Sequence, residues 1–405
     1  IDDKADEVPR STRLLSTPSI LKTANELENE HLKVSVNPNG TFNIFDKKNG
    51  RLYSDLNYFE DNGQVGDYWI DKAPVHDQIV NSLGCSANIW TEDVGPLSAT
   101  LATKITMDIP ARAIRAEGKR SENTAQMEIT TYITLEHNAE CVKVKVVFDN
   151  QAEDHKMKAR FPTELEKADF ACSGGHFNVD KRPIETPGPS KHLQWPDMQT
   201  QPQNQFVDVS DGKHGLAIIN NGLTEYDVTD DTSRTLGITL VRSVHNWICT
   251  ESRAGSVFPS QKGGQCLGRQ VQEYAVMPHK GDCFTENIPL LASLFNTPAI
   301  PVQTRRKEGR QREMEKSYFS ISNPNAVFSA FKKAEQSDNY IVRIYNPTAE
   351  RMKTEIGFAG KIEKAWETNL NEERQGEIEV NEDRLTLTIN AKKIVTVEVA
   401  FSKLG

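Results

Sequence analysis

Residues 63–78, with the sequence GQVGDYWIDKAPVHDQ, gather side chains that could do chemistry. Within eleven positions they bring together the carboxylate, imidazole and aromatic groups of Asp67, Tyr68, Trp69, Asp71, His76 and Asp77. Carboxylates and imidazoles bind metals and transfer protons, and aromatic rings can stack on the apolar face of a ligand. In an extended segment, however, the neighbours His76 and Asp77 project to opposite faces, which disfavours a shared metal ion.

Other catalytic signatures are absent from the sequence. It contains no Gly-x-Ser-x-Gly nucleophile elbow and no Gly-rich loop leading from a strand into a helix. The six cysteines form no Cys-x-x-Cys pair, so a structural zinc site is not expected, although disulfides stay open. The 57 acidic residues could supply a glycosidase carboxylate pair, but no spacing singles out two of them.

Length and charge limit the class of protein. With 405 residues, at about 100–200 residues per domain, two or three domains are expected. The net charge of −9 argues against nucleic acid or an anionic membrane as a partner. No apolar run approaches the roughly 18 residues that span a bilayer, so a soluble protein is expected, with the cytoplasm favoured. Because the chain opens at Ile1, it is expected to be part of something longer.

Apolar residues recur mainly with a period of two, which is typical of strands with one buried face. The clearest runs cover residues 127–135, 142–148, 385–389 and 395–399. Asn-Gly pairs at 39–40, 49–50 and 221–222 mark turns beside further short strands. A helix is expected only at Pro18–Glu30, and the sequence therefore predicts antiparallel sheets packed as sandwiches.

Composition also predicts the domain boundaries. Residues 1–25 are polar and contain two prolines, as in a linker or the tail of a preceding helical domain. Residues 26–300 form a large β region, and residues 301–316 form a densely charged linker. Residues 317–405 are then expected to form a small terminal β-sandwich.

Six stretches, in order along the chain, resemble a known family. They are LENEHLKVSVNPNGTFNIFDKKNGR (27–51), HKMKARFPTEL (155–165), NQFVDVSDGKHGLAIINNGLTEYDV (204–228), LGITLVRSV (236–244), QCLGRQVQEYAV (265–276) and NAVFSAFKKAEQSDNYIVRIYNPT (325–348). Together they resemble the C-terminal β half of glycoside hydrolase family 38, the α-mannosidases, and are most similar to its bacterial members. The resemblance implies a galactose-mutarotase-like supersandwich followed by a small β-sandwich.

The same resemblance implies a division of labour between two halves of an enzyme. Family members hydrolyse terminal α-mannosides with retention of configuration. Their nucleophilic Asp and zinc ligands belong to an N-terminal α/β domain and a helical bundle, which would precede residue 1. This chain would then hold no catalytic residue and no metal of its own, and its partners would be those domains and a mannose-containing carbohydrate.

The resemblance also implies substrate-binding residues. An aromatic loop of the family's β half matches Gly66-Asp67-Tyr68-Trp69, although Trp69 stands where many members carry Tyr. A Tyr hydroxyl can donate and accept hydrogen bonds, whereas the Trp ring nitrogen only donates. A second approach to the site corresponds to Arg253. The alternatives are that Trp69 belongs to the core and that Arg253 forms a surface ion pair.

Two other functions stay open at the level of the sequence. A free-standing carbohydrate-binding module could use the same sandwich, with exposed aromatics in a groove. A complete enzyme of mutarotase or lyase type could use His and Glu as general acid and base. Fold analogy alone does not separate these functions.

Overall fold

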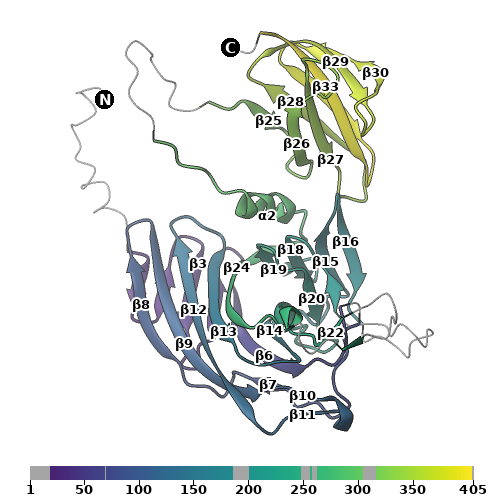
Figure 1. Cartoon of the computed structure of the whole chain (residues 1–405). Helices are drawn as coiled ribbons and strands as arrows, with labels where there is room; N and C mark the ends of the chain where they lie inside the picture. Colours follow the sequence, from purple (N-terminus) through teal and green to yellow (C-terminus); the bar gives the residue numbers. More distant parts are fainter. Residues whose placement is uncertain are drawn as a thin grey trace. The chain divides into compact units, whose positions relative to one another are not determined.

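A computed structural model of the chain describes residues 19–68, 70–185, 200–247, 256–257, 262–303 and 316–403 (Figure 1). The chain divides into two compact units. The first unit covers residues 1–173 and 181–286, and the second covers residues 174–180 and 287–405. The regular secondary structure of both is almost entirely antiparallel strand, which confirms the predicted all-β class. Most of the predicted charged linker, residues 304–315, lies outside the described residues.

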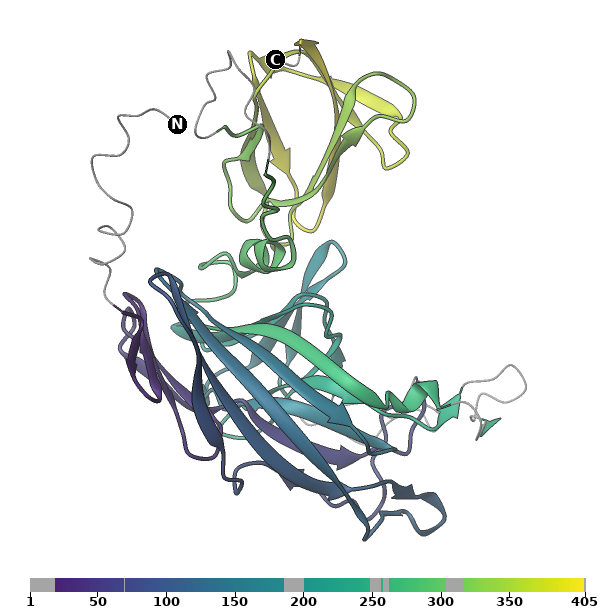
Figure 2. The same ribbon diagram turned by 60° about the vertical axis from the view of Figure 1, so that its left-hand side comes forward.

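A nine-stranded sheet forms one layer of the first unit. Its order is β16-β15-β18-β19-β24-β13-β12-β9-β8, and all neighbouring strands from β15 to β8 are antiparallel. Figures 1 and 2 show its long strands side by side, from blue β9 to green β24. The strands are β8 (Asn88–Val94), β9 (Ser98–Pro110), β12 (Thr124–Glu136), β13 (Val142–Asn150), β15 (Phe170–Gly175), β16 (Asn178–Pro183), β18 (Phe206–Ser210), β19 (His214–Asn220) and β24 (Gly268–Lys280).

A six-stranded sheet, in the order β17-β20-β21-β14-β6-β7, forms a second layer. Its strands are β6 (Tyr58–Gly63), β7 (Val80–Asn81), β14 (His155–Phe161), β17 (Gln201–Pro202), β20 (Glu225–Val228) and β21 (Leu236–Arg242). A five-stranded meander precedes both sheets, with strands β1 (Leu21–Thr23), β2 (Glu26–Glu28), β3 (Leu32–Val36), β4 (Phe42–Asp46) and β5 (Arg51–Leu56). Two short ribbons complete the unit: β10 (Ala113–Ile114) with β11 (Lys119–Arg120), and β22 (Asn246–Trp247) with β23 (Ser256–Val257).

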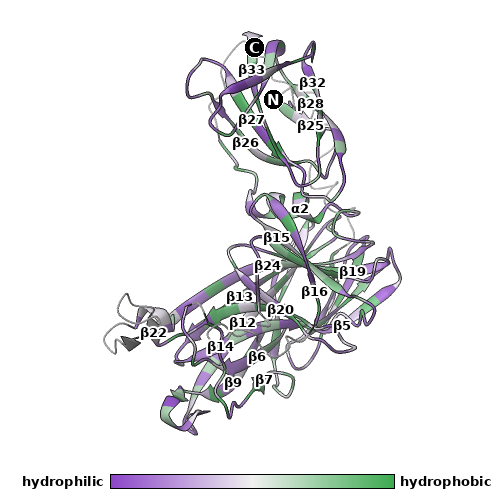
Figure 3. Ribbon diagram, turned by 90° about the vertical axis from the view of Figure 1, so that its right-hand side faces the viewer, coloured by the Kyte–Doolittle hydropathy of each residue, from purple (hydrophilic) through white to green (hydrophobic). Residues whose placement is uncertain are grey.

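The core of the first unit lies between these sheets because their inward residues are apolar at every second position. The predicted strands at 127–135 and 142–148 are confirmed as parts of β12 and β13, and Figure 3 shows hydrophobic and hydrophilic residues alternating along strands. Across the core, the rings of Phe161 on β14 and Tyr274 on β24 meet edge to face, with 5.9 Å between their centroids. The turn prediction also holds, since Gly40, Gly50 and Gly222 all adopt positive φ.

The helix predicted over residues 18–30 is wrong for the part that the structure describes. Residues 21–28 instead form the hairpin of β1 and β2. Leu27 is buried, whereas its neighbours Glu26 and Glu28 are only partly buried. Leu27 also pairs with Val34 of β3. Burial of every second residue is the pattern of a strand. The apolar residues of this segment are too few for a continuous helical stripe, and burial against the meander decides the conformation.

The second unit is a small β-sandwich with its own apolar core. One sheet has the order β25-β28-β32-β31 and the other β26-β27-β33-β29-β30. Its elements are α2 (Ile288–Asn296), β25 (Phe319–Ile321), β26 (Val327–Lys333), β27 (Tyr340–Tyr345), β28 (Met352–Phe358), β29 (Lys361–Thr368), β30 (Arg374–Ile378), β31 (Val380–Asn381), β32 (Arg384–Ile389) and β33 (Ile394–Lys403). The predicted strands at 385–389 and 395–399 are confirmed as β32 and part of β33.

Candidate functional site

The site is organised around the polar face of β14, in the middle of the six-stranded sheet. Met157, Ala159 and Phe161 point into the apolar core. The alternate residues Lys156, Lys158 and Arg160 therefore share the opposite face, and all three are buried. Buried cations are stable only when carboxylates and hydrogen bonds compensate for lost hydration, so the partners of this row define the site.

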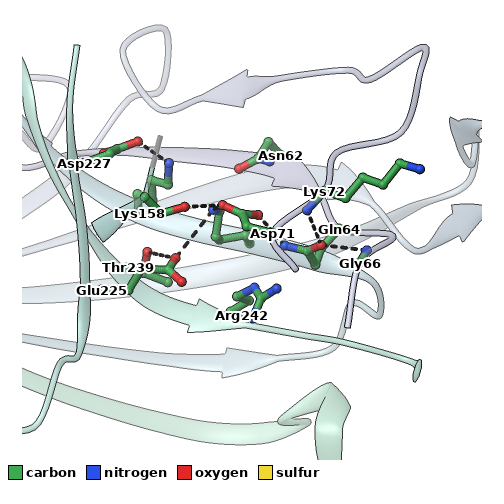
Figure 4. A network of polar contacts seen from close by, with 12 residues as sticks. Asn62, Gln64, Gly66, Asp71, Lys72, Lys158, Glu225, Asp227, Thr239 and Arg242 are labelled. Carbon is green, nitrogen blue, oxygen red and sulfur yellow. Dashed lines mark hydrogen bonds and ion pairs between the residues drawn. The ribbon is translucent and has the colours of Figure 1, made fainter. Parts of the chain in front are cut away.

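Acidic residues of β6 and β20 neutralise Lys158 and Arg160 of this row. Lys158 binds Asp227 of β20, as Figure 4 shows. Arg160 binds the same carboxylate, with 2.6 Å between Arg160 Nη1 and Asp227 Oδ1. Arg160 Nε also donates to Glu60 Oε1 of β6 at 3.1 Å. Two cations thus share two carboxylates within the described part of the sheet, and the charges balance locally.

Gly237 leaves room for the ion pair between Arg160 and Asp227. In the sheet, Gly237 of β21 lies opposite Arg160 on one side and Asp227 on the other. A Cβ atom at position 237 would stand 2.4 Å from both Arg160 Nη1 and Asp227 Oδ1. The ion pair therefore crosses over the intervening strand, through space that any larger residue would fill.

The pKa values of Asp227 and Lys158 follow from their burial and from the different numbers of charged neighbours that each has. Burial alone would raise the pKa of Asp227, but the charges of Lys158 and Arg160 outweigh it and hold that pKa below the usual range. Burial lowers the pKa of Lys158, and the charge of Asp227 only partly offsets this. The two cationic neighbours therefore favour the ionised form of the Asp227 carboxylate.

A hairpin spanning residues 64–72 covers the near end of the row, and its own side chains shape it. The buried Gln64 accepts hydrogen bonds from the backbone amides of Gly66 at 2.8 Å and Lys72 at 3.1 Å. Asp67, also buried, closes the tip by accepting from the amide of Ile70 at 2.8 Å. Only glycine fits at position 66, where a Cβ atom would stand 1.8 Å from the carbonyl oxygen of Ile70.

A β-bulge in β21 aims Arg242 at this hairpin. Lys158 pairs with Thr239, whereas Met157 pairs with Val241, so Leu240 is the extra residue on the bulged strand. The bulge changes the alternation and puts Arg242 on the polar face, opposite Lys156. Arg242 Nη2 then donates to the carbonyl oxygens of Asp67 at 2.6 Å and Ile70 at 2.8 Å.

Asp71 links the hairpin to the cation row. Its Oδ1 accepts from Gln64 at 2.7 Å, and its Oδ2 binds Lys156 and the hydroxyl of Thr200. Burial would raise the pKa of Asp71, but Lys156 and the hydrogen bonds from Thr200 and Gln64 together bring it well below the usual range. The hairpin is thereby fixed to the sheet by a carboxylate that is ionised at neutral pH.

Lys156 has a second acidic neighbour, Glu225 of β20, which also faces a cavity. Lys156 Nζ lies 3.5 Å from Glu225 Oε1, and the Thr239 hydroxyl donates to the same oxygen at 2.8 Å. Figure 4 shows Glu225, Thr239 and Arg242 around this position. No described residue donates to Glu225 Oε2.

The cavity has a volume of about 520 Å³ and lies wholly within the first unit. Its lining combines charged, amide and hydroxyl groups with apolar faces: Tyr68, Asp71, Thr200, Gln201, Pro202, Gly222, Leu223, Thr224, Glu225, Thr239, Leu240, Val241, Arg242, Val244, Cys266, Gln270 and Gln272. Tyr68, at the hairpin tip, is 46% exposed and forms an aromatic wall. A concave lining that combines polar groups with apolar faces is typical of small-molecule binding sites.

The residues expected from the sequence are only partly brought together. Tyr68 lines the cavity, while Asp67 holds the hairpin turn beneath it. Trp69 and Arg253 lie outside the described residues. The row on β14, Glu225 and Arg242 were not expected, although alternation of cations with apolar residues in HKMKARF signalled a buried charged face.

His76 and Asp77 do not form a metal centre. His76 is exposed, and Asp77 accepts from the amide of Gly63 with both oxygens, at 3.0 and 3.1 Å. Within the described ranges, no three His, Cys, Asp or Glu side chains are grouped to hold a metal ion. The described residues thus do not fit a zinc site. The five described cysteines are free thiols, and no helix in the described parts is long and apolar enough to cross a membrane.

Comparison with known proteins decides the family. Residues 27–246 match the model of the glycosyl hydrolases family 38 C-terminal domain, which is more than half of the chain. The chain belongs to glycosyl hydrolase family 38. Residues 325–397 also match the C-terminal β-sandwich domain of this family. The site described above, from the hairpin to β21, falls within the first match.

Relatives and solved structures agree with this assignment. A putative mannosylglycerate hydrolase from Halalkalibacterium halodurans is 29% identical over 366 residues, covering 86% of this chain and 38% of the relative. Alpha-mannosidase 2C1 of Mus musculus is 23% identical over 59% of this chain and 21% of its own length. The crystal structure of an α-mannosidase from Enterococcus faecalis V583 matches with a TM-score of 0.81 and 26% identity, over 94% of this chain and 43% of that chain. The family 38 chain thus spans about two fifths or less of these proteins.

The ion pair between Arg160 and Asp227 crosses Gly237, and this geometry leads to a first prediction. Gly237→Ala should displace Arg160 or Asp227 and destabilise the first unit by about 3 kcal/mol, the lower end for breaking a buried ion pair. Chemical denaturation should measure the loss. Gly84→Ala is the matched control, because no heavy atom lies within 4 Å of its added Cβ. Equal stability of the two variants would contradict the crossing geometry.

The lowered pKa of Asp71 leads to a prediction about acid. Its ionised form is favoured by folding, so the stabilisation is complete above the unfolded pKa near 3.8 and declines as pH falls through the lower folded pKa. Asp71→Asn should lower the melting temperature at pH 7 and flatten its dependence on pH below 4. A variant that keeps the acid dependence of the wild type would rule out Asp71 as a source. Thermal melts monitored by circular dichroism between pH 2 and 7 provide the measurement.

Proposed function

We propose that this chain is the C-terminal, substrate-lining and structural portion of a family 38 glycosidase that hydrolyses terminal α-mannosides. The observation that carries the proposal is the hairpin of residues 64–72, which Arg242 and Lys156 hold beside a polar cavity in a family 38 domain. Several relatives bear the names of mannoside hydrolases. Family 38 C-terminal domains normally accompany an N-terminal catalytic domain, which is the proposed partner.

In this proposal the chain helps to position the substrate and does not itself cleave the glycosidic bond. Tyr68 offers its ring to the C–H face of a mannose unit and its hydroxyl to a sugar hydroxyl. By the family resemblance, Trp69 and Arg253 are further proposed substrate contacts, and Asp67 keeps the tip closed. By the family resemblance, the nucleophile and the zinc belong to the catalytic partner.

A free-standing carbohydrate-binding module is the second candidate, and the cavity itself favours it. A 520 Å³ pocket with an exposed Tyr can bind a sugar ring without any catalytic partner. The two functions differ in whether the chain is needed for hydrolysis. A measurement of hydrolysis distinguishes the two functions, whereas a measurement of sugar binding does not.

Hydrolysis of an aryl α-mannoside tests the proposal. The 405-residue chain alone, in EDTA, should release no more aryl alcohol than buffer does. The chain joined to a family 38 N-terminal catalytic portion should hydrolyse the substrate with zinc present. Hydrolysis by the isolated chain, or an N-terminal portion equally active without this chain, would refute the proposed role.

The aromatic wall can be tested in the joined enzyme. Tyr68→Ala should lower kcat/KM about tenfold, because a ring contact contributes about 1.4 kcal/mol. Tyr68→Phe should retain the stacking contact and lose less. Tyr318→Ala, which removes an exposed tyrosine of the second unit, is the matched control and should leave kcat/KM unchanged. Wild-type kinetics for Tyr68→Ala would remove Tyr68 from the substrate wall.

A further inference from the structure

We infer that the cavity recognises a glycoside that carries a carboxylate, and that Arg242 is the residue that binds this acidic group. The inference deepens the proposed function, because it adds a charged group to the proposed mannoside. It rests on that function only for the identity of the sugar as mannose. Recognition of the carboxylate follows from the contacts of Arg242 itself.

Arg242 differs from the other cations of the polar face in having no described counterion. Lys156, Lys158 and Arg160 each form an ion pair with at least one carboxylate. Arg242 forms no ion pair with a described residue, and its hydrogen bonds go to two neutral carbonyl oxygens of the hairpin. Among the described residues that line the cavity, Arg242 is also the only cation. Its positive charge is therefore available to a ligand in the cavity.

The guanidinium group of Arg242 also has N–H hydrogens to spare. Its hydrogens are divided among Nε, Nη1 and Nη2. Nη2 uses its hydrogens for the carbonyl oxygens of Asp67 and Ile70, at 2.6 and 2.8 Å. Nε is buried without a partner, and Nη1 has no acceptor among the described residues. A ligand oxygen at Nη1 would thus use hydrogens that the described chain leaves unbonded.

A carboxylate is the acceptor that matches this group best. Hydrogen bonds between a guanidinium and a carboxylate are charge-assisted and stronger than bonds to a neutral oxygen. A carboxylate also supplies the single negative charge that would balance Arg242. A phosphate monoester carries nearly two negative charges at neutral pH. The second charge would lack a partner, since the neighbouring Lys156 is already held by Asp71 and Glu225.

Glu225 and Arg242 together give the ligand an orientation (Figure 4). Both line the cavity, and Glu225 Oε1 is held by Thr239 and Lys156, while no described residue donates to Oε2. A carboxylate beside Oε2 would be repelled, whereas a hydroxyl there would donate a hydrogen bond. The ligand therefore directs a hydroxyl toward Glu225 and its carboxylate toward Arg242. A glycoside with one acidic substituent offers both groups.

Ligands of the same shape and different charge test the assignment. Carboxymethyl α-mannopyranoside ends in a carboxylate, and carbamoylmethyl α-mannopyranoside ends in a neutral amide of similar size. The 405-residue chain is titrated with each at pH 7 and low salt, by ligand-observed NMR. The wild type should bind the acid about tenfold more tightly than the amide, as expected for one charge-assisted hydrogen bond. The phosphonomethyl analogue, which carries more charge, should bind more weakly than the carboxylate.

Variants assign the preference to Arg242. Arg242→Gln removes the positive charge and should reduce the preference for the acid to about twofold or less. Because Arg242 also supports the hairpin, Gln64→Ala is the control that loosens the hairpin without changing a charge. It should weaken both ligands and keep their ratio. Arg269→Gln is the matched charge control, since it removes an exposed arginine outside the cavity, and it should bind both ligands as the wild type does.

A further variant leaves the hairpin contacts of Arg242 in place. Glu225→Gln removes the negative charge that faces the same cavity and should widen the preference for the acid. This readout also decides the question if Arg242→Gln does not fold. Circular dichroism and melting temperature verify the folding of each variant.

Four results would overturn the inference. The first is a wild type that binds the acid no more tightly than the amide, or that binds neither. The second is a folded Arg242→Gln that keeps the preference. The third is a folded Glu225→Gln whose preference does not widen. The fourth is tighter binding of the phosphonate than of the carboxylate.

The outcome is distinguishable from that of the proposed function. If the joined enzyme fails to hydrolyse α-mannosides while the chain prefers the acid, the proposed function falls and recognition of the carboxylate stands. If the joined enzyme is active and the chain shows no preference for the acid, the inference falls alone.

Discussion

The buried row of cations on β14 is the constraint around which the first unit is arranged. Lys156, Lys158 and Arg160 occupy a face from which water is largely excluded, so each needs a carboxylate nearby. The partners come from β6, from β20 and from the hairpin of residues 64–72. One electrostatic requirement therefore ties together chain segments that are separated by up to 100 residues.

The hairpin shows how this requirement positions a candidate ligand wall. Asp71 attaches its base to Lys156, and Arg242 holds its tip through two backbone carbonyls. Because those contacts involve the main chain of the tip, they fix the loop without using the ring of Tyr68. The main chain of the tip is thus held in place while the ring of Tyr68 stays partly exposed at the cavity, so an exposed aromatic residue has a defined position.

Local patterns predicted much of the fold. Alternation predicted β12, β13, β32 and β33, and Asn-Gly pairs predicted the turns that follow β3, β4 and β19, because both signals depend on neighbouring residues. The segment at 18–30 was misread because its conformation depends on burial of Leu27 against β3. The site was harder to predict. Glu225 meets Lys156 across 69 residues and Arg242 reaches Asp67 across 175, and the bulge that aims Arg242 leaves no local mark in the sequence.

The crossing at Gly237 has a consequence for how the sheet assembles. Arg160 and Asp227 belong to strands that are not neighbours, and their contact passes above a third strand. The pair can therefore close at its native distance only when β21 lies between β14 and β20 in the correct register. A sheet with those two outer strands joined directly, or with β21 shifted by one residue, would leave side chains where the opening should be and charges without counterions. Because residue 237 is a glycine, the ion pair forms only when the three strands are in their native order and register.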